Sequence, residues 1–246
     1  MPRERILILG GTSDARHLAD GLVEQGFDVT TSFAGVTASP LLPLGAHHVG
    51  GFGGADGLAA FLRAGGFDRV VDATHPFAAQ MSAHAHAACE SVKLPLSRLE
   101  RPTWVAGPGD TWINAATLAE AAKKVPQQAR VLLTTGHKGL DGFFAREDLG
   151  GLVRVIEDPA LALPQGWALV SERPPHRLEG ELALLQREAI TCVVSKNSGG
   201  SGTEAKLEAA RQLGLPVVMV RRPAKPPVRS FPDVAAALLG ITGKAG

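Results

Sequence analysis

The sequence predicts an α/β protein built from two Rossmann-like three-layer domains with parallel sheets and an interdomain cleft. Short runs of Val, Leu and Ile alternate with longer helical patterns along its 246 residues, an order typical of parallel sheets covered by helices. These runs are apolar throughout, as strands buried on both faces require. Residues 102–112 (PTWVAGPGDTW) show no periodicity and divide the pattern. We therefore expect an N-terminal domain at 1–104 and a C-terminal domain at 105–246.

The individual elements have clear local signatures. Residues 5–9 (RILIL) predict a buried strand, a Gly-Gly-Thr turn follows, and apolar residues at helical spacing predict a helix over 13–24. Further strands of the first half are predicted at 28–33, 47–49, 69–75 and 95–101, and further helices at 56–64 and from Pro76 to about Lys93. In the second half the predicted strands are 130–136, 152–157, 167–172, 191–197 and 216–220, and the last helix covers 233–239.

Composition excludes several classes of protein. A formal net charge of +1 provides no overall field that would attract nucleic acid or an anionic membrane. No apolar stretch approaches the roughly 20 residues that span a bilayer, and the first apolar run is too short for a signal peptide. The two cysteines, Cys89 and Cys192, lie in apolar surroundings and provide no disulfide framework. We expect a cytoplasmic protein.

The turn after the first strand is the first candidate binding site. Gly10, Gly11 and Thr12 open a helix that also carries Arg16. Glycine lets the backbone approach a ligand, and the free N–H groups and dipole of a helix N-terminus favour a phosphate. The turn is not a GxGxxG motif, and the alternative is a plain tight turn in which Thr12 or Ser13 caps the helix.

The ends of the next strands indicate which nucleotide fits. NAD sites carry an acidic residue after the second strand for the ribose diol, whereas residues 30–35 (TTSFAG) contain no acid. Small hydroxyl side chains tolerate a 2′-phosphate, so the predicted cofactor is NADPH. Thr74, His75 and Phe77 also lie between a strand and a helix, where Thr74 could hydrogen-bond the cofactor. The alternative there is a helix cap with a core Phe.

Two turns of the second half combine glycine, hydroxyls and lysine, the composition of an anion cradle. The sequence TTGHK places Thr135, Gly136 and Lys138 after one strand. SKNSGG follows another strand, and Lys206 lies about one helical turn beyond it. The alternative is a solvated surface loop. Both interpretations place the lysines at the surface, so replacing one should hardly change stability.

The absence of other motifs excludes several enzyme mechanisms. The chain has no tyrosine, which excludes the Tyr-Lys proton donor of short-chain dehydrogenases. GxSxG, HExxH and metal-ligand spacings do not occur either, so hydrolase and metalloenzyme interpretations have no support and no metal site is expected.

Taken in order, GGTSDAR, DATHPFA, LERPTW, TTGHKGL and VSKNSGG resemble the precorrin-6A reductase family over nearly the whole chain. The resemblance implies NADPH-dependent reduction of precorrin-6A to precorrin-6B in cobalamin (vitamin B12) biosynthesis, by hydride transfer to the tetrapyrrole macrocycle. It also implies a cleft shared by cofactor and tetrapyrrole, and an exchange of strands between the two domains. Family members often read Gly-Arg-Thr where this chain has Gly35-Val36-Thr37.

The resemblance assigns candidate site residues to two sets. The cofactor-binding set comprises Gly10, Gly11, Thr12, Arg16, Thr74, His75 and Phe77. The second set, which holds substrate or cofactor, comprises Thr135, Gly136, Lys138, Ser195, Lys196, Asn197, Ser198 and Lys206. The partners implied are the polycarboxylate tetrapyrrole, held through charge-assisted bonds, and neighbouring pathway enzymes that hand it over. No residue is identified as the proton donor.

Two other functions fit parts of the pattern. A nonenzymatic two-lobed α/β module could sense a nucleotide or a phosphorylated metabolite with the same turns. A methyltransferase of the same pathway would use S-adenosylmethionine, but the acid that usually ends its second strand is missing here. Binding of NADPH would separate a reductase from both.

Overall fold

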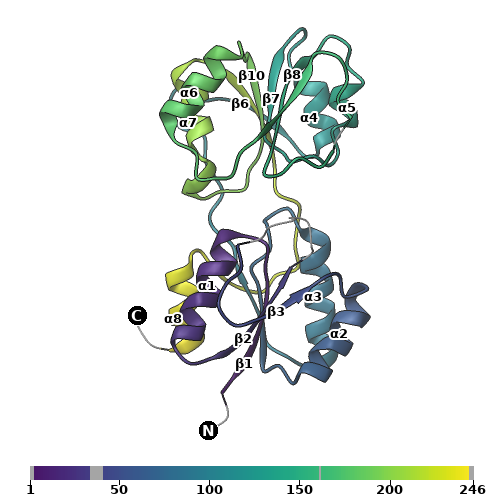
Figure 1. Ribbon diagram of the computed structural model, residues 1–246, viewed down its shortest axis with the longest axis vertical. Helices are drawn as coiled ribbons and strands as arrows, with labels where there is room; N and C mark the ends of the chain where they lie inside the picture. Colours follow the sequence, from purple (N-terminus) through teal and green to yellow (C-terminus); the bar gives the residue numbers. More distant parts are fainter. Residues whose placement is uncertain (1–2, 34–40, 161, 244–246) are drawn as a thin grey trace. The chain divides into compact units, whose positions relative to one another are not determined.

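The computed structural model describes residues 3–33, 41–160 and 162–243, whose course is shown in Figure 1. The chain separates into two compact units. One comprises Met1–Pro102 together with Pro223–Gly246, and the other comprises Thr103–Arg222. Each contains a six-stranded, all-parallel sheet, which confirms the predicted Rossmann-like α/β class. Residues 34–40, which include the Gly35-Val36-Thr37 position, lie outside the described residues.

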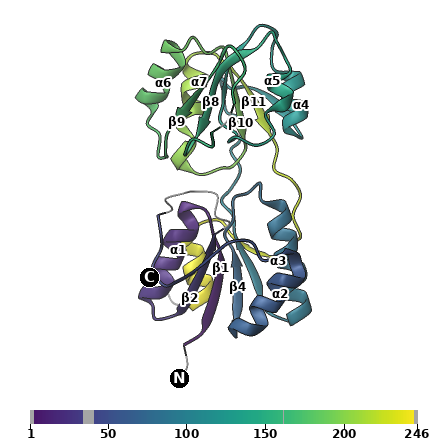
Figure 2. The same cartoon turned by 45° about the vertical axis from the view of Figure 1, so that its right-hand side comes forward.

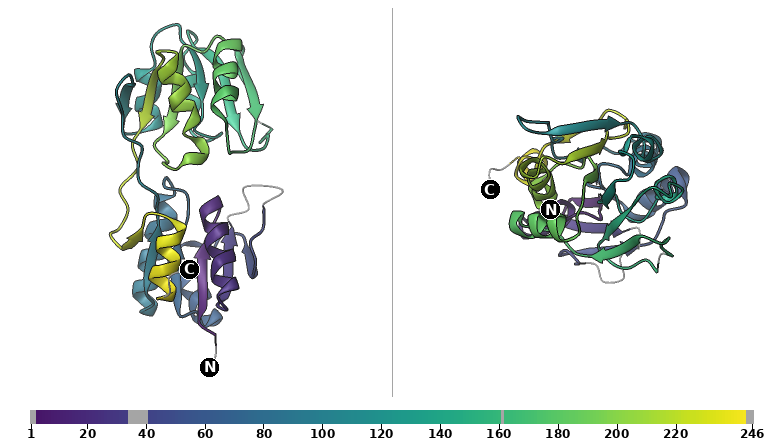
Figure 3. Two further views of the ribbon diagram at one scale, coloured as in Figure 1. Left: turned by 90° about the vertical axis from the view of Figure 1, so that its left-hand side faces the viewer. Right: turned by 90° about the horizontal axis from the view of Figure 1, so that it is seen from above.

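The first unit has the strand order β12-β5-β4-β1-β2-β3. Its strands are β1 (Arg5–Leu9), β2 (Asp28–Phe33), β3 (Ala46–Val49), β4 (Arg69–Asp72), β5 (Leu96–Leu99) and β12 (Arg229–Phe231). Its helices are α1 (Ser13–Glu24), α2 (Gly54–Gly65), α3 (Ala79–Val92) and α8 (Val234–Thr242). One face of the sheet packs on α1 and α8 and the other on α2 and α3, as Figures 1 and 3 show.

The second unit repeats this architecture with the order β6-β11-β10-β7-β8-β9. Its strands are β6 (Thr111–Ala115), β7 (Arg130–Leu133), β8 (Gly150–Val155), β9 (Trp167–Ser171), β10 (Cys192–Lys196) and β11 (Pro216–Val220). Its helices are α4 (Leu118–Lys124), α5 (Asp141–Phe144), α6 (Leu178–Arg187) and α7 (Ala205–Gln212), with a 3₁₀ turn, η1, at Ser201–Thr203. Figure 2 shows α6 and α7 on one side of this sheet and α4 and α5 on the other.

The end of the chain differs from the predicted division at 1–104 and 105–246. Residues 223–246 belong to the first unit, because β12 pairs with β5 and Phe231 packs into the core that contains Ile6 and Leu18. The helix α8 begins after Asp233, whose carboxylate accepts from the Ala236 N–H at 2.7 Å. The chain first passes from one unit to the other between Pro102 and Thr103, two residues before the predicted domain boundary between residues 104 and 105.

The strand order places one topological switch point in each sheet. In the first unit the chain runs from β1 outward to β2 and β3, and then returns to β4 on the other side of β1. In the second unit β7 continues outward to β8 and β9, and β10 returns to the other side of β7. Open parallel sheets bind ligands at the carboxyl ends of the two strands that flank such a point. The ends of β1 with β4, and of β7 with β10, are therefore the expected ligand-binding positions of the two sheets.

None of the described helices is long and apolar enough to cross a membrane. Within the same described residues, no group of three or more His, Cys, Asp and Glu side chains is arranged to hold a metal ion.

Candidate functional site

The turn after β1 leaves open backbone at the N-terminus of α1. Gly11 has φ +105°, and a Cβ built on it would meet nothing within 4 Å. Gly10 is small for a different reason, because its Cβ would lie 2.8 Å from Thr31 Cγ2 and 3.0 Å from the Ser32 carbonyl oxygen. Gly10 therefore allows close packing on β2, whereas Gly11 leaves room for a ligand beside the N–H groups of the first helical turn.

Thr12 joins the two strands that flank the switch point. Its hydroxyl accepts from the Ala15 N–H at 3.0 Å, which makes Thr12 the N-cap of α1. The same hydroxyl donates to the Ala73 carbonyl at 2.9 Å, at the end of β4. This hydroxyl therefore acts as a structural bridge, and the capping role considered from the sequence is confirmed.

Arg16 lies half-buried near this end of α1, with one guanidinium nitrogen 3.2 Å from His17 Nε2. Asp14, in the first turn of the same helix, pairs with Arg101 at 3.1 Å. The start of α1 thus combines a helix N-terminus with a nearby cation, which together favour an anion.

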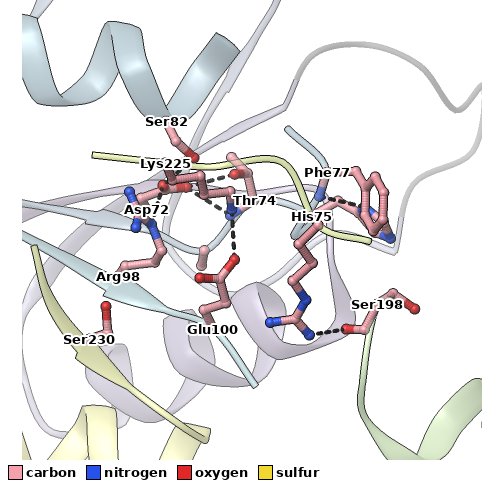
Figure 4. A network of polar contacts seen from close by, with 12 residues as sticks. Asp72, Thr74, His75, Phe77, Ser82, Arg98, Glu100, Ser198, Lys225 and Ser230 are labelled. Atoms are coloured by element: carbon pink, nitrogen blue, oxygen red, sulfur yellow. Dashed lines mark hydrogen bonds and ion pairs between the residues drawn. The ribbon is translucent and has the colours of Figure 1, made fainter. Parts of the chain in front are cut away.

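The turn after β4 contains Thr74, His75 and Phe77. Thr74 donates to the Asp72 carboxylate from its backbone N–H at 3.2 Å and from its hydroxyl at 2.6 Å. The Phe77 N–H donates to His75 Nδ1 at 3.2 Å, and the two rings lie 5.8 Å apart, as Figure 4 shows. The helix α3 starts only at Ala79, so Pro76 lies in this turn and not in the first turn of the helix.

In the second unit Lys196 connects the ends of β10 and β7. Its ammonium donates to the Thr135 carbonyl at 2.7 Å, and burial lowers the pKa of this lysine below its usual range. Gly136 follows with φ +79° and open space where a Cβ would stand. The hydroxyl of Thr135 is buried and meets no partner among the described residues. A partly buried cation, an open glycine and a hydroxyl therefore meet at this switch point, as an anion site requires.

Three further polar residues of the second set lie in different environments. The Ser195 hydroxyl is buried and donates to the Lys196 carbonyl at 3.2 Å. The Ser198 carbonyl accepts from Arg222 at 2.9 Å. Lys138 is exposed on the loop after Gly136. Lys138 is thus an exposed cation beside the switch point, whereas Ser195 bonds within its own segment and Ser198 bonds to Arg222 after β11.

Asn197 has a structural role that the sequence did not reveal. Its side-chain oxygen accepts from the Trp104 N–H at 2.8 Å, and its side-chain nitrogen donates to the Trp104 carbonyl at 2.9 Å. Arg222 donates to the Asn197 carbonyl at 2.8 Å, and the Trp104 indole donates to the Gly200 carbonyl at 3.1 Å. Asn197 therefore fastens the SKNSGG segment to the start of its own unit.

Lys206 is not the surface lysine that the sequence predicted. Lys206 is only 4% exposed to solvent, and its ammonium donates to the Thr203 carbonyl at 2.5 Å. The same ammonium lies 4.7 Å from the centre of the Trp104 ring, a cation–π distance. The expectation of a surface position failed because Trp104, about one hundred residues earlier in the chain, covers this part of α7.

Trp104 and Asp72 are the two residues whose importance only the structure makes clear. Trp104 stands in the segment without periodicity, where nothing predicts burial, yet it is 8% exposed. Asp72 precedes the Thr74 turn, and its 1% exposure separates it from an ordinary strand-end acid. The signal available in the sequence was an acid at the end of an apolar strand, two residues before the polar pair Thr74-His75.

Comparison with known proteins identifies the family of this chain. The family model described as Precorrin-6x reductase CbiJ/CobK matches residues 5–239. The chain belongs to this family. The chain is therefore an oxidoreductase of cobalamin biosynthesis, as the resemblance implied, and not a nonenzymatic sensor or a methyltransferase.

Individual relatives cover almost the whole chain. A precorrin-6A reductase of Rhodococcus erythropolis is 46% identical over 240 residues, which are 96% of this chain and 97% of that protein. One of Rhodobacter capsulatus is 45% identical over 242 residues, which are 97% and 94% of the two chains. A solved structure described as CobK precorrin-6A reductase superposes with a TM-score of 0.92 at 42% identity, covering 98% of this chain and 96% of the other.

The buried position of Lys206 predicts that its replacement costs stability. Lys206→Ala loses the bond to the Thr203 carbonyl, the cation–π contact and the packing on Trp104. We expect the free energy of unfolding to fall by about 1–3 kcal/mol. Lys138→Ala, at an exposed position on the same edge, should change it by no more than about 0.5 kcal/mol. Urea denaturation of both variants measures the difference, and equal midpoints would contradict the burial of Lys206.

Proposed function

We propose that this chain uses NADPH to reduce precorrin-6A to precorrin-6B. The observation that carries the proposal is the family match over residues 5–239 together with an open glycine turn at the switch point of the first sheet. The relatives of Rhodococcus erythropolis and Rhodobacter capsulatus are named precorrin-6A reductases. Bound NADPH would supply a hydride from its nicotinamide C4 to a C=N or C=C unit of the macrocycle, and a proton completes the reduction.

The residues of the first unit suit the phosphates of a dinucleotide. The open space above Gly11 lets a phosphate approach the N–H groups at the start of α1, where the helix dipole stabilises negative charge. Arg16 adds a cation, and the turn of Thr74, His75 and Phe77 follows the neighbouring strand of the switch point. These residues bind and orient the cofactor in this proposal, together with Gly10 and Thr12, which shape the turn.

The residues of the second unit suit carboxylates. Lys196 and Lys138 provide positive charge, and Gly136 provides open backbone beside it. Thr135, whose hydroxyl is buried, positions the Lys196 ammonium through its carbonyl. A corrin precursor carries many acetate and propionate groups, which such donors hold through charge-assisted bonds. In this proposal Ser195, Asn197, Ser198 and Lys206 support the shape of this edge through their internal contacts.

A preference for NADPH over NADH is the first test of the proposed function. In β2 the polar residues Thr30, Thr31 and Ser32 are all buried and none is acidic, so a ribose 2′-phosphate meets no carboxylate from them. We expect the Kd of NADPH to be lower by about tenfold or more, equivalent to about 1.4 kcal/mol. Calorimetry with both nucleotides measures this, and NADPH oxidation on addition of precorrin-6A tests the reaction. Equal Kd values would refute the preference, and absence of turnover would refute the reductase assignment.

The glycine turn offers a matched pair of substitutions. Gly11 and Gly26 both have positive φ, +105° and +91°, and neither would bring a Cβ within 4 Å of another group. Gly11→Ala and Gly26→Ala should therefore strain the backbone alike, by about 1–2 kcal/mol. Only Gly11→Ala places a methyl group where we propose the phosphate, so it should weaken NADPH binding by about tenfold while Gly26→Ala does not. If the two variants bind NADPH equally, the β1–α1 turn is not the phosphate site.

Lys196 offers a test with a pH signature. Lys196→Met keeps the length of the side chain but loses its charge, so affinity for the tetrapyrrole should fall by about one to two decades, or about 1.5–3 kcal/mol. Lys123→Met, at an exposed position on α4, should leave it unchanged. Because burial lowers the pKa of Lys196, its charge is lost at a lower pH than that of an ordinary lysine as the pH rises. The affinity gap between wild type and Lys196→Met should therefore shrink on alkaline titration, and a gap independent of pH would contradict the assignment.

A further inference from the structure

We infer that Asp72 is a positioning residue for cofactor binding, whose carboxylate fixes the Thr74–Phe77 turn at the switch point of the first sheet. The inference rests on the proposed function of that turn. Asp72 ends β4 and is 1% exposed, so it cannot itself be a surface ligand for a dinucleotide. Its effect on binding must pass through the residues that it holds.

The two carboxylate oxygens of Asp72 face different parts of the unit. Oδ1 accepts both bonds from Thr74, from its backbone N–H and from its hydroxyl. Oδ2 accepts from the Ser82 hydroxyl at 2.6 Å, on α3, and from Arg98 Nε at 3.0 Å, on β5. Figure 4 shows this carboxylate between Thr74, Ser82 and Arg98. One oxygen therefore holds the binding turn, and the other anchors the carboxylate in the core.

The segment that returns to the first unit completes the anchor. Arg98 donates to the Pro226 carbonyl at 3.1 Å, and Lys225 pairs with Glu100 at 2.9 Å. The side chains of Arg98 and Lys225 are each 5% exposed. Asp72 thus lies among β4, β5, α3 and the start of the last segment, which fixes the carboxylate more rigidly than a surface loop would.

The electrostatic surroundings keep Asp72 ionised. Burial alone raises the pKa of its carboxyl, but the hydrogen bonds from Ser82, Thr74 and Arg98 and the charge of Lys225 outweigh this, so the pKa lies below its usual range. An ionised carboxylate accepts on both oxygens, whereas an amide accepts on only one. Position 72 therefore requires a carboxylate if both the turn and the anchor are to be held.

The decisive experiment compares Asp72→Asn with Ser82→Ala, since each removes part of the same buried network. In Asp72→Asn the amide oxygen turns to Arg98, because the charge-assisted bond is the stronger one, and the NH₂ group faces the Thr74 donors. The binding turn then loses its acceptor. In Ser82→Ala the two bonds to Thr74 remain. Both variants should lose stability, but only Asp72→Asn should loosen the turn.

The expected result is a difference between cofactor binding and chemistry. Asp72→Asn should raise the Kd and the KM of NADPH by about tenfold, with kcat and the KM of precorrin-6A changed by less than about threefold. Ser82→Ala should change the NADPH Kd by less than about twofold at a comparable loss in melting temperature. If both variants weaken NADPH binding only in proportion to their loss of stability, Asp72 is merely structural and the inference is wrong.

Two further outcomes are distinguishable. If wild-type protein binds no NADPH, the proposed function fails and the inference fails with it; if wild type binds and Asp72→Asn binds equally well, the inference alone fails. Should Asp72→Asn not fold, the double variant Asp72→Leu/Arg98→Met removes the buried cation together with its carboxylate and leaves Thr74 without a side-chain acceptor at position 72. Comparison of its NADPH Kd with that of Arg98→Met alone then shows the same difference of about tenfold if Asp72 positions the turn, and no difference if it does not.

Discussion

Parallel pairing of the strands is the constraint from which both candidate sites arise. In each sheet all six strands point the same way, so every turn that leaves a carboxyl end lies along one edge. The helices cover both faces and leave this edge as the place where backbone groups remain accessible. Where the strand order reverses, the two turns leave in opposite directions and space opens between them. The motifs of Gly11 and Thr74, and of Gly136 and Lys196, fall at these two reversals and nowhere else along the described sheets.

Polar residues at these edges divide into those that build the edge and those that remain directed at a ligand. Some polar side chains form hydrogen bonds with backbone groups of their own unit, as do those of Thr12, Asn197 and Lys206. These bonds are expected, because leaving a buried polar group without a partner destabilises a protein by more than one hydrogen bond stabilises it. Gly11 and Gly136 offer open backbone instead. A binding role is therefore better supported for the two glycines than for the polar side chains that share their motifs.

Most of the fold could be predicted from the sequence, and the gaps have physical causes. In RILIL four consecutive apolar residues follow Arg5, and PVVMV is apolar throughout, so β1 and β11 have the predicted bounds. The strands β6 and β12 were missed because they are short and their residues are mostly exposed or half-exposed, which leaves no apolar signal. Residues 223–246 were assigned to the wrong unit for a related reason: β12 pairs with β5, about 130 residues earlier, and no local pattern encodes that distance. In the site, backbone turns were predictable from glycine, but the contacts of Trp104 with Lys206 and Asn197 were not.

The departure from the GxGxxG pattern can now be understood residue by residue. In that pattern the first glycine allows the tight turn, the second lets the backbone approach the pyrophosphate, and the third position, Gly or Ala, packs the helix on the strand. Here Gly10 stands at the first position, where its lack of a side chain allows close packing on β2, and Ala15, only 1% exposed, fills the third role. Thr12 replaces the second glycine and uses its hydroxyl to cap α1 and to hold the end of β4. The open backbone moves one residue earlier, to Gly11, whose φ of +105° no other residue adopts without strain. In place of the second glycine, Thr12 thus provides a hydrogen bond that joins the β1 turn to Ala73, directly after Asp72 at the end of β4.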